Sequence, residues 1–134
     1  MDEKTLRQKY LGIPYKHRGR DMKGLDCWGF PILAFRDDGI ELLDMENYDV
    51  KWSYQGKNYF IDNYYKNWEE QKIPKFFDLL LFKNSEGVAC HVGIYLSHND
   101  FMHCCKGAGI VIAKITDPKW KEKLFGIYRY NRNK

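Results

Sequence analysis

The chain contains no long apolar run, and this absence argues against a membrane-spanning helix. Its longest apolar stretches, such as Leu79-Leu80-Leu81-Phe82, are far shorter than the run of about 20 apolar residues that a helix needs to cross a bilayer. The N-terminal residues from Met1 to Arg7 carry charges where a secretory signal would need an apolar core. We therefore expect synthesis in the cytoplasm, without a signal peptide and without a membrane span.

Cysteine is scarce and its spacing is irregular. The four cysteines are Cys27, Cys90, Cys104 and Cys105, so that two are adjacent and none forms a C-x-x-C pair. A disulfide framework usually shows more regular spacing than this. The pattern predicts reduced cysteines, with at least one free thiol.

No block of one charge sign dominates the sequence. The chain has 22 Lys and Arg against 18 Asp and Glu, which gives a net charge of +4 that is spread along its length. No nucleic-acid-binding motif accompanies the basic residues, so we expect no nucleic-acid partner. An aromatic share of 16% argues against disorder. The length fits one domain, which we place at residues 1–134.

Helical patterns in the first half give way to strand patterns in the second. We expect helices at Glu3–Tyr10, Cys27–Phe35 and Phe60–Gln71, and a loop at Arg18–Gly24. Short strands separated by turn residues are expected at Asp78–Phe82, Val92–Leu96, Phe101–Cys104, Ile110–Ile115 and Phe125–Tyr130. Helices followed by an antiparallel sheet are typical of the α+β class.

Cys27 stands at the expected start of a helix, directly after Asp26, a good N-cap residue. Unpaired backbone N–H groups and the helix dipole at such a position favour the thiolate, which is the nucleophilic form of cysteine. An inert, buried cysteine is the alternative that this position alone leaves open. Pro31 falls at the end of the first helical turn, where proline is barely tolerated.

A nucleophilic thiol needs a base, which is normally a histidine. His91 opens one expected strand and His103 lies in the next strand. If these strands form a hairpin, the two rings can meet across it, and His103 can orient His91. His17 and His98 do not fit this arrangement.

Metal binding is the rival function for the same segment. Cys90-His91 and His103-Cys104-Cys105 contain five possible ligands of zinc. Neighbouring residues of a strand point to opposite faces, so we expect Cys90 and His91 to diverge. The sequence therefore predicts no metal site.

Four segments together resemble the NlpC-type bacterial cell-wall cysteine endopeptidases, a papain-like family. The segments are Leu11–Tyr15, Gly24–Phe30, His91–Leu96 and Phe101–His103, and the resemblance extends from about Leu6 to Arg129. It implies a papain-like α+β domain. In such a domain the N-terminal helices, with the nucleophile at a helix start, pack on an antiparallel β-sheet.

The same resemblance implies roles for individual residues. Cys27 matches the nucleophile, His91 the base and His103 the orienting polar residue. Tyr15 matches a tyrosine that lies over the site, and Arg18 stands where family members often have a glycine. An arginine there is expected to bind substrate carboxylates. No cofactor is implied.

The implied activity is cleavage of the peptidoglycan stem peptide between D-glutamate and the diamino acid. Trp28 and the segment Trp120–Arg129 resemble the phage-tail branch of the family, which implies other tail proteins as partners. The implied location is a phage tail or, after release, the cell wall. Two alternatives stay open. One is a structural tail-assembly module with little hydrolysis, and the other is an amidase or acyltransferase that uses the same Cys–His site.

Overall fold

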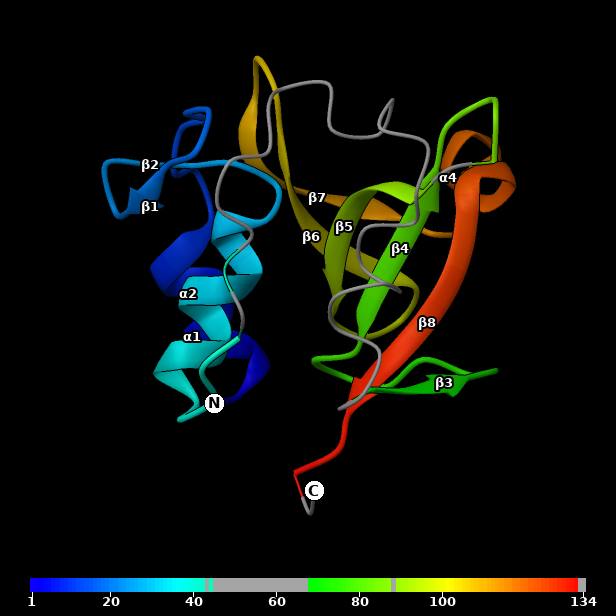
Figure 1. Ribbon diagram of the computed structural model, residues 1–134, viewed down its shortest axis with the longest axis horizontal. Coiled ribbons are helices and arrows are strands. Elements are labelled where there is room, and N and C mark those ends of the chain that lie inside the picture. Colours follow the sequence, from blue (N-terminus) through cyan, green and yellow to red (C-terminus); the bar gives the residue numbers. More distant parts are fainter. Residues whose placement is uncertain (43, 45–67, 88, 133–134) are drawn as a thin grey trace.

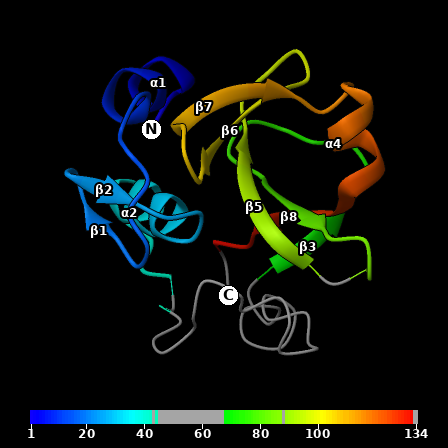
Figure 2. The same cartoon turned by 90° about the horizontal axis from the view of Figure 1, so that it is seen from above.

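The computed structural model describes residues 1–42, 44, 68–87 and 89–132. Helices α1 (Glu3–Tyr10) and α2 (Gly29–Asp37) lie beside a curved antiparallel sheet, and a short helix α4 (Pro118–Lys123) lies on the side of the sheet away from them (Figures 1 and 2). Among the described residues, no helix has the length and apolar character needed to cross a membrane.

The main sheet has six strands in the order β3-β8-β4-β5-β6-β7. Each of its neighbouring pairs is antiparallel, and the last strand in the sequence lies between β3 and β4 (Figure 1). A separate short hairpin, β1 (Arg20–Asp21) and β2 (Gly24–Leu25), precedes α2. The strands of the main sheet are β3 (Trp68–Gln71), β4 (Leu79–Lys83), β5 (Ala89–Tyr95), β6 (Asp100–Cys105), β7 (Gly109–Lys114) and β8 (Leu124–Tyr130).

The predicted α+β class is confirmed, and the five predicted strands correspond to β4 to β8. The helix predicted at Phe60–Gln71 is wrong for Trp68–Gln71, which form β3; residues 60–67 lie outside the described residues. Pairing with β8 and the packing of Trp68 on Tyr130 outweigh the local pattern. The predicted loop Arg18–Gly24 contains most of the β1–β2 hairpin instead.

Helix α4 was not predicted, although its start follows a familiar pattern. The Asp117 side chain accepts a hydrogen bond from the backbone N–H of Lys119 at 3.0 Å, and Pro118 occupies the first turn. Both features are typical of helix N-termini. Helix α2 likewise tolerates Pro31, because it is the third helical residue, where the backbone N–H has no intrahelical partner.

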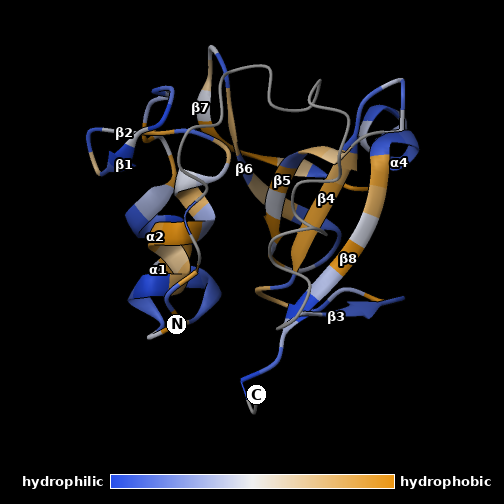
Figure 3. Ribbon diagram, viewed as in Figure 1, coloured by the Kyte–Doolittle hydropathy of each residue, from blue (hydrophilic) through white to orange (hydrophobic). Residues whose placement is uncertain are grey.

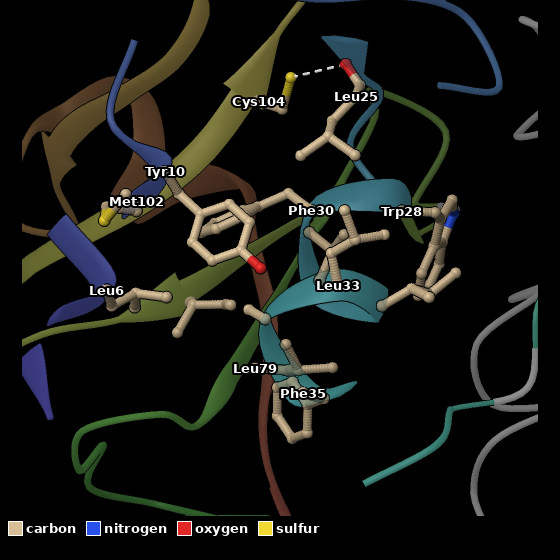
Figure 4. Close-up of a cluster of buried hydrophobic side chains, with 14 of the residues drawn as sticks. Leu6, Tyr10, Leu25, Trp28, Phe30, Leu33, Phe35, Leu79, Met102 and Cys104 are labelled. Carbon is tan, nitrogen blue, oxygen red and sulfur yellow. Dashed lines mark hydrogen bonds between the residues drawn. The ribbon is translucent and has the colours of Figure 1, made fainter. Parts of the chain in front are cut away.

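The sheet separates two apolar clusters, one on each face. The larger cluster joins α1 and α2 to one face of the sheet (Figure 4) and includes Val92 and Ile94 of β5. Tyr95 of the same strand belongs to the second cluster, because successive strand residues point to opposite faces. Figure 3 shows the apolar character of α2 and the central strands against the hydrophilic α1, β3 and α4. The members of the second cluster are Leu80, Phe82, Tyr95, Phe101 and Ile127, with Trp120 and Leu124 packed against them.

Candidate active site

Cys27 lies in the turn that leads into α2, and the helix itself begins two residues later at Gly29. The Asp26 carboxylate accepts hydrogen bonds from the backbone N–H groups of Trp28 at 3.1 Å and Gly29 at 2.7 Å. The N-cap position of α2 is Trp28, whose side chain forms no capping hydrogen bond. The Asp26 side chain binds the N–H groups at the helix start instead and fixes the backbone that follows Cys27.

A partly buried ion pair holds the segment before Cys27 in place. Asp26 is only 2% exposed, and its carboxylate also accepts from Arg20 Nη1 at 2.9 Å and from the backbone N–H of Arg18 at 2.9 Å. Arg20 in turn donates to both carboxylate oxygens of Asp44 at 3.0 Å. Sequence reasoning missed Arg20, because no spacing rule links it to Asp26 and the contact depends on the β1–β2 hairpin.

Two further contacts position this segment. Residue Tyr15 forms an isolated parallel bridge with Leu25, and the Cys104 thiol of β6 donates to the Leu25 carbonyl at 3.0 Å (Figure 4). The turn that carries Cys27 is thereby attached to the sheet through β6. Cys104 is structural in this arrangement, since it is buried and its sulfur is engaged.

Tyr15 lies near Cys27, and Arg18 lies on the loop between them in sequence. Burial raises the pKa of the Tyr15 hydroxyl, and the nearby Cys27 and Asp26 raise it further. Arg18 is exposed and adopts a positive φ of 61°, a conformation that glycine takes without strain. A glycine at this position, as the family often has, would therefore fit the same backbone.

His91 and His103 are in direct contact, as expected for neighbouring strands. His91 Nε2 lies 2.7 Å from His103 Nδ1. His103 is 1% exposed, whereas His91 is half-buried. The ring of His91 stacks on Trp120, with centroids 5.8 Å apart and an interplanar angle of 27°. One imidazole is thus held by the other and by an indole that sequence reasoning did not connect with the site.

Both imidazoles are neutral in this environment. Burial lowers the pKa of His91 to about 3, and His103, Lys123 and Lys119 act in the same direction. Burial also lowers the pKa of His103 to about 4, with a further contribution from Lys119. The positively charged form of either ring would be poorly solvated here.

Cys27 and His91 are not hydrogen-bonded to each other in the described part of the chain. Cys27 packs against the helix-side cluster, whereas the His91 ring contacts Trp120 and Phe82 of the second cluster. Burial holds the pKa of the Cys27 thiol well above its ordinary value, and Asp26 adds to this effect. This is opposite to the lowering expected from a helix start, because burial outweighs the helix dipole.

His91 opens onto a pocket of about 470 Å³ at the end of β5. Cys90 lines the same pocket, and it adds to the effect of burial that raises the pKa of the Cys27 thiol. A register shift between Phe82 and Lys83, which pair with His91 and Ala89, leaves Cys90 as an extra residue of β5. The divergence of Cys90 and His91 stays a prediction. The pocket lining consists of Phe82, Lys83, Asn84, Ser85, Cys90, His91, Cys105, Lys106, Trp120 and Lys123.

A larger hollow of about 590 Å³ lies elsewhere, and no cysteine or histidine lines it. Its wall includes Asp78, which is 1% exposed. Asp78 accepts from Arg129 Nε and Nη2, both at 2.8 Å. This bidentate ion pair joins the start of β4 to β8, and a structural role accounts for it.

Comparison with known proteins relates this geometry to other chains. Residues 12–129 match the NlpC/P60 family. Murein DD-endopeptidase MepS/Murein LD-carboxypeptidase of Escherichia coli is 31% identical over 115 residues, which cover 85% of this chain and 54% of that protein. Probable peptidoglycan endopeptidase LytE of Bacillus subtilis is 25% identical over 90% of this chain and 31% of its own length. The chain thus spans about half the length of MepS and less of LytE.

Solved structures share the fold. An NlpC/P60 family protein from Bacillus cereus superposes with a TM-score of 0.70 at 22% identity, over 96% of this chain and 39% of the other. The NlpC/p60 domain of peptidoglycan hydrolase SagA superposes with a TM-score of 0.57 at 23% identity, over 96% of this chain and 95% of the other. The papain-like, NlpC-type α+β fold predicted from the sequence is therefore confirmed. The chain belongs to the NlpC/P60 family.

Proposed function

We propose that this chain is a cysteine endopeptidase that cleaves the peptidoglycan stem peptide between D-glutamate and the diamino acid. Its relatives MepS and LytE are named as murein and peptidoglycan endopeptidases. The observation that carries the proposal is the 2.7 Å contact between His91 and His103 at the edge of a pocket. A buried histidine that orients a more exposed one is the arrangement that a catalytic base requires.

The His91–His103 contact determines which nitrogen of His91 takes part in the proposed reaction. Nε2 of His91 is engaged by His103, so Nδ1 is the nitrogen that exchanges a proton with the substrate and with Cys27. As the sulfur of Cys27 attacks the amide carbonyl, its proton passes to His91 Nδ1 and a C–S bond forms. His91 then protonates the leaving amine as the C–N bond breaks.

Hydrolysis of the thioester completes the cycle. His91 takes a proton from water, the hydroxide adds to the thioester carbonyl, and the sulfur leaves with a proton from His91. The backbone N–H of Cys27 is the proposed donor to the tetrahedral oxyanion. These steps use only groups of this chain and water.

The resting state holds a neutral thiol and two neutral imidazoles. A thiolate without a cationic partner would be costly at the partly buried Cys27, which agrees with its raised pKa. Catalytic hydrogen bonds are often absent or long without substrate and tighten in the substrate complex. We propose that the Cys27–His91 contact forms only in the substrate complex, when the His91 ring leaves its stacking contact with Trp120.

Tyr15 and Arg18 are proposed to shape substrate binding. Tyr15 lines a hollow of about 310 Å³ together with Gly12, Pro14 and the turn 107–109. Its hydroxyl is proposed to donate to the substrate carbonyl or to the oxyanion. The exposed Arg18 precedes Cys27 on the anchored loop, and its guanidinium matches the carboxylates of a stem peptide.

We also propose that the chain acts in a phage tail, and that the tail brings it to the cell wall. This part rests on the resemblance of Trp28 and the Trp120–Arg129 segment to tail-associated members of the family. Mass spectrometry of purified particles after prophage induction tests it directly. Detection of the chain in particles supports the role, and its presence only in the particle-free lysate opposes it.

Digestion of defined muropeptides tests the activity. We expect mass spectrometry of the products to reveal a new amino group on the diamino acid, and Cys27→Ala to yield no product. His98→Ala is the matched control, because His98 lies in an exposed turn away from the pocket. Release of the intact stem peptide from the glycan would identify an amidase instead. No product from the folded parent protein would favour the structural tail module.

A further inference from the structure

On one face of the β5–β6 hairpin, His91 and His103 converge with a third side chain, Cys105, that the proposed reaction does not use. The ligand atoms of His91, His103 and Cys105 all lie within 4.8 Å of one another. His103 and Cys105 are alternate residues of β6, so their side chains share a face. The Cys105 sulfur lies 3.3 Å from His103 Nδ1, which is itself 2.7 Å from His91 Nε2.

We propose that His91, His103 and Cys105 form a zinc-binding site. Two imidazole nitrogens and one thiolate are ligands that Zn²⁺ prefers. Tetrahedral zinc with ordinary bond lengths places its nitrogen ligands about 3.3 Å apart and a nitrogen and a sulfur about 3.6 Å apart. The observed separations of 2.7 Å and 3.3 Å therefore need small outward movements. The ligand atoms of His91 and Cys105, which lie within 4.8 Å of each other, must approach to about 3.6 Å.

The site has an open approach for the metal ion. His91 and Cys105 both line the pocket of about 470 Å³, so Zn²⁺ can enter from solvent and keep a water molecule as its fourth ligand. Three lysines also line this pocket: Lys83, Lys106 and Lys123. Their positive charge opposes the binding of a dication. We therefore expect a reversible site rather than a permanently occupied one.

The expectation of no metal site covered these three residues, but its geometric argument compared only adjacent positions of one strand. Adjacent strand residues were expected to diverge, and that argument concerned Cys90 next to His91. The converging set contains neither Cys90 nor Cys104, but joins His91 to two alternate positions of the neighbouring strand. Because His91 and Cys105 are far apart in the sequence, a search for closely spaced metal ligands does not detect this set.

Zinc at this site would inhibit hydrolysis, and this consequence rests on the proposed function. Zn²⁺ would occupy the lone pairs of His91 and His103 and break the contact that orients the base. Zinc availability would then regulate the peptidase reversibly, with chelation restoring activity. The binding itself is independent of whether the chain is an active peptidase.

Equilibrium dialysis against Zn²⁺ with elemental analysis, using reduced and chelator-treated protein, tests the binding. We expect one zinc per chain and at least about tenfold weaker binding by Cys105→Ser, since even the loss of outer-shell partners costs this much. Cys90→Ser is the matched control, because Cys90 lines the same pocket but lies outside the ligand set. An equal loss of zinc affinity in Cys105→Ser and Cys90→Ser, or no zinc binding by the parent protein, would overturn the proposed site.

Two further measurements separate the possible failures. Co²⁺ bound to the parent protein should give a thiolate-to-cobalt charge-transfer band, which Cys105→Ser should lack and Cys90→Ser should keep. This spectrum shows whether Cys105 binds the metal, even if a variant binds zinc abnormally for other reasons. Muropeptide cleavage is then compared in chelator and in Zn²⁺. Cys105-dependent binding without any cleavage in chelator would reject the proposed function alone. Cleavage that is unaffected by Zn²⁺, in a protein without the cobalt band, would reject the zinc site alone.

Discussion

Gly29, the first residue of α2, packs directly against the carbonyl oxygen of Gly19. A Cβ atom on Gly29 would fall well inside van der Waals distance of that oxygen and would also meet Arg20 Nη1 at 3.0 Å. Gly19 is on the loop that also carries Arg18 and Arg20, whose groups bind Asp26. The close approach of these two backbones therefore determines where the turn with Cys27 lies.

Gly29→Ala is expected to destabilise the protein by about 2–3 kcal/mol, as overpacking of a rigid contact does. Denaturant unfolding followed by circular dichroism measures the change. Gly39→Ala is the control: a Cβ there has open space, and its φ of +81° costs only backbone strain of about 1–2 kcal/mol. A Gly29→Ala variant as stable as the parent would show that the loop is not held in this position.

His103→Ala is expected to retain a small, measurable activity, whereas Cys27→Ala and His91→Ala lose it. His103 contacts His91 rather than the proposed substrate position, so its loss should lower kcat by about 10²–10⁴-fold through misorientation of the base. Steady-state kinetics on a muropeptide measure this. His17→Ala and His98→Ala should stay near the parent, and full activity of His91→Ala would reject the assigned base.

Protein stability is expected to fall as the pH drops below about 6.5. The folded state holds His91 and His103 neutral, with pKa values of about 3 and 4 against an ordinary 6.5. The unfolded state therefore binds more protons in this range, so the stabilising contribution is complete above pH 6.5 and declines toward pH 4. For His103 the loss is on the order of 3 kcal/mol.

Denaturant unfolding at several pH values, in the presence of a chelator, checks this dependence. Carboxylates also titrate at the acidic end, so the comparison is with His103→Gln, which lacks one of the two buried bases. This variant should show a smaller slope of unfolding free energy between pH 6.5 and 5. Equal slopes for the variant and the parent would mean that His103 does not contribute.

Cys27 of the resting protein is expected to react slowly with iodoacetamide at pH 7. Its position at a helix start predicts the most reactive of the four thiols, but burial and Asp26 hold its pKa well above the ordinary value. Labelling followed by peptide mapping should show modification of Cys27 rising steeply with pH. Asp26→Asn should accelerate the labelling of Cys27, because this change removes the carboxylate charge that helps to raise the pKa of the thiol. Rapid labelling of Cys27 at neutral pH would instead indicate a preformed thiolate–imidazolium pair.

Tyr15→Phe and Arg18→Gly are expected to affect different kinetic constants. Loss of the Tyr15 hydroxyl should mainly lower kcat, whereas loss of the Arg18 guanidinium should mainly raise KM and reduce its salt dependence. Because Arg18 has a φ of 61°, Arg18→Gly should leave stability unchanged or slightly increased. Kinetics at two salt concentrations and an unfolding curve decide both points. Unchanged constants in both variants would remove these residues from the substrate site.

Local patterns were sufficient to predict the strands β4 to β8 and helix α1, because alternation and capping act over a few residues. They failed at Trp68–Gln71, whose strand conformation depends on β8 about sixty residues later. Short motifs predicted Cys27, His91 and His103 as site residues, and of these the structure brings His91 and His103 into contact. Arg20, Cys105 and Trp120 were missed at the site, because a hairpin, a strand pairing and the placement of α4 bring them there.

The position of β8 between β3 and β4 has a consequence for folding. Strands β4 to β7 are sequence neighbours that pair as hairpins, so their contacts close short loops and can form early. The other edge of β4 and the strand β3 can pair only when residues 124–130 are present, because both pair with β8. During synthesis β4 therefore presents an unpaired, strongly apolar edge until the last strand leaves the ribosome, and this interval is when the chain is most prone to aggregate.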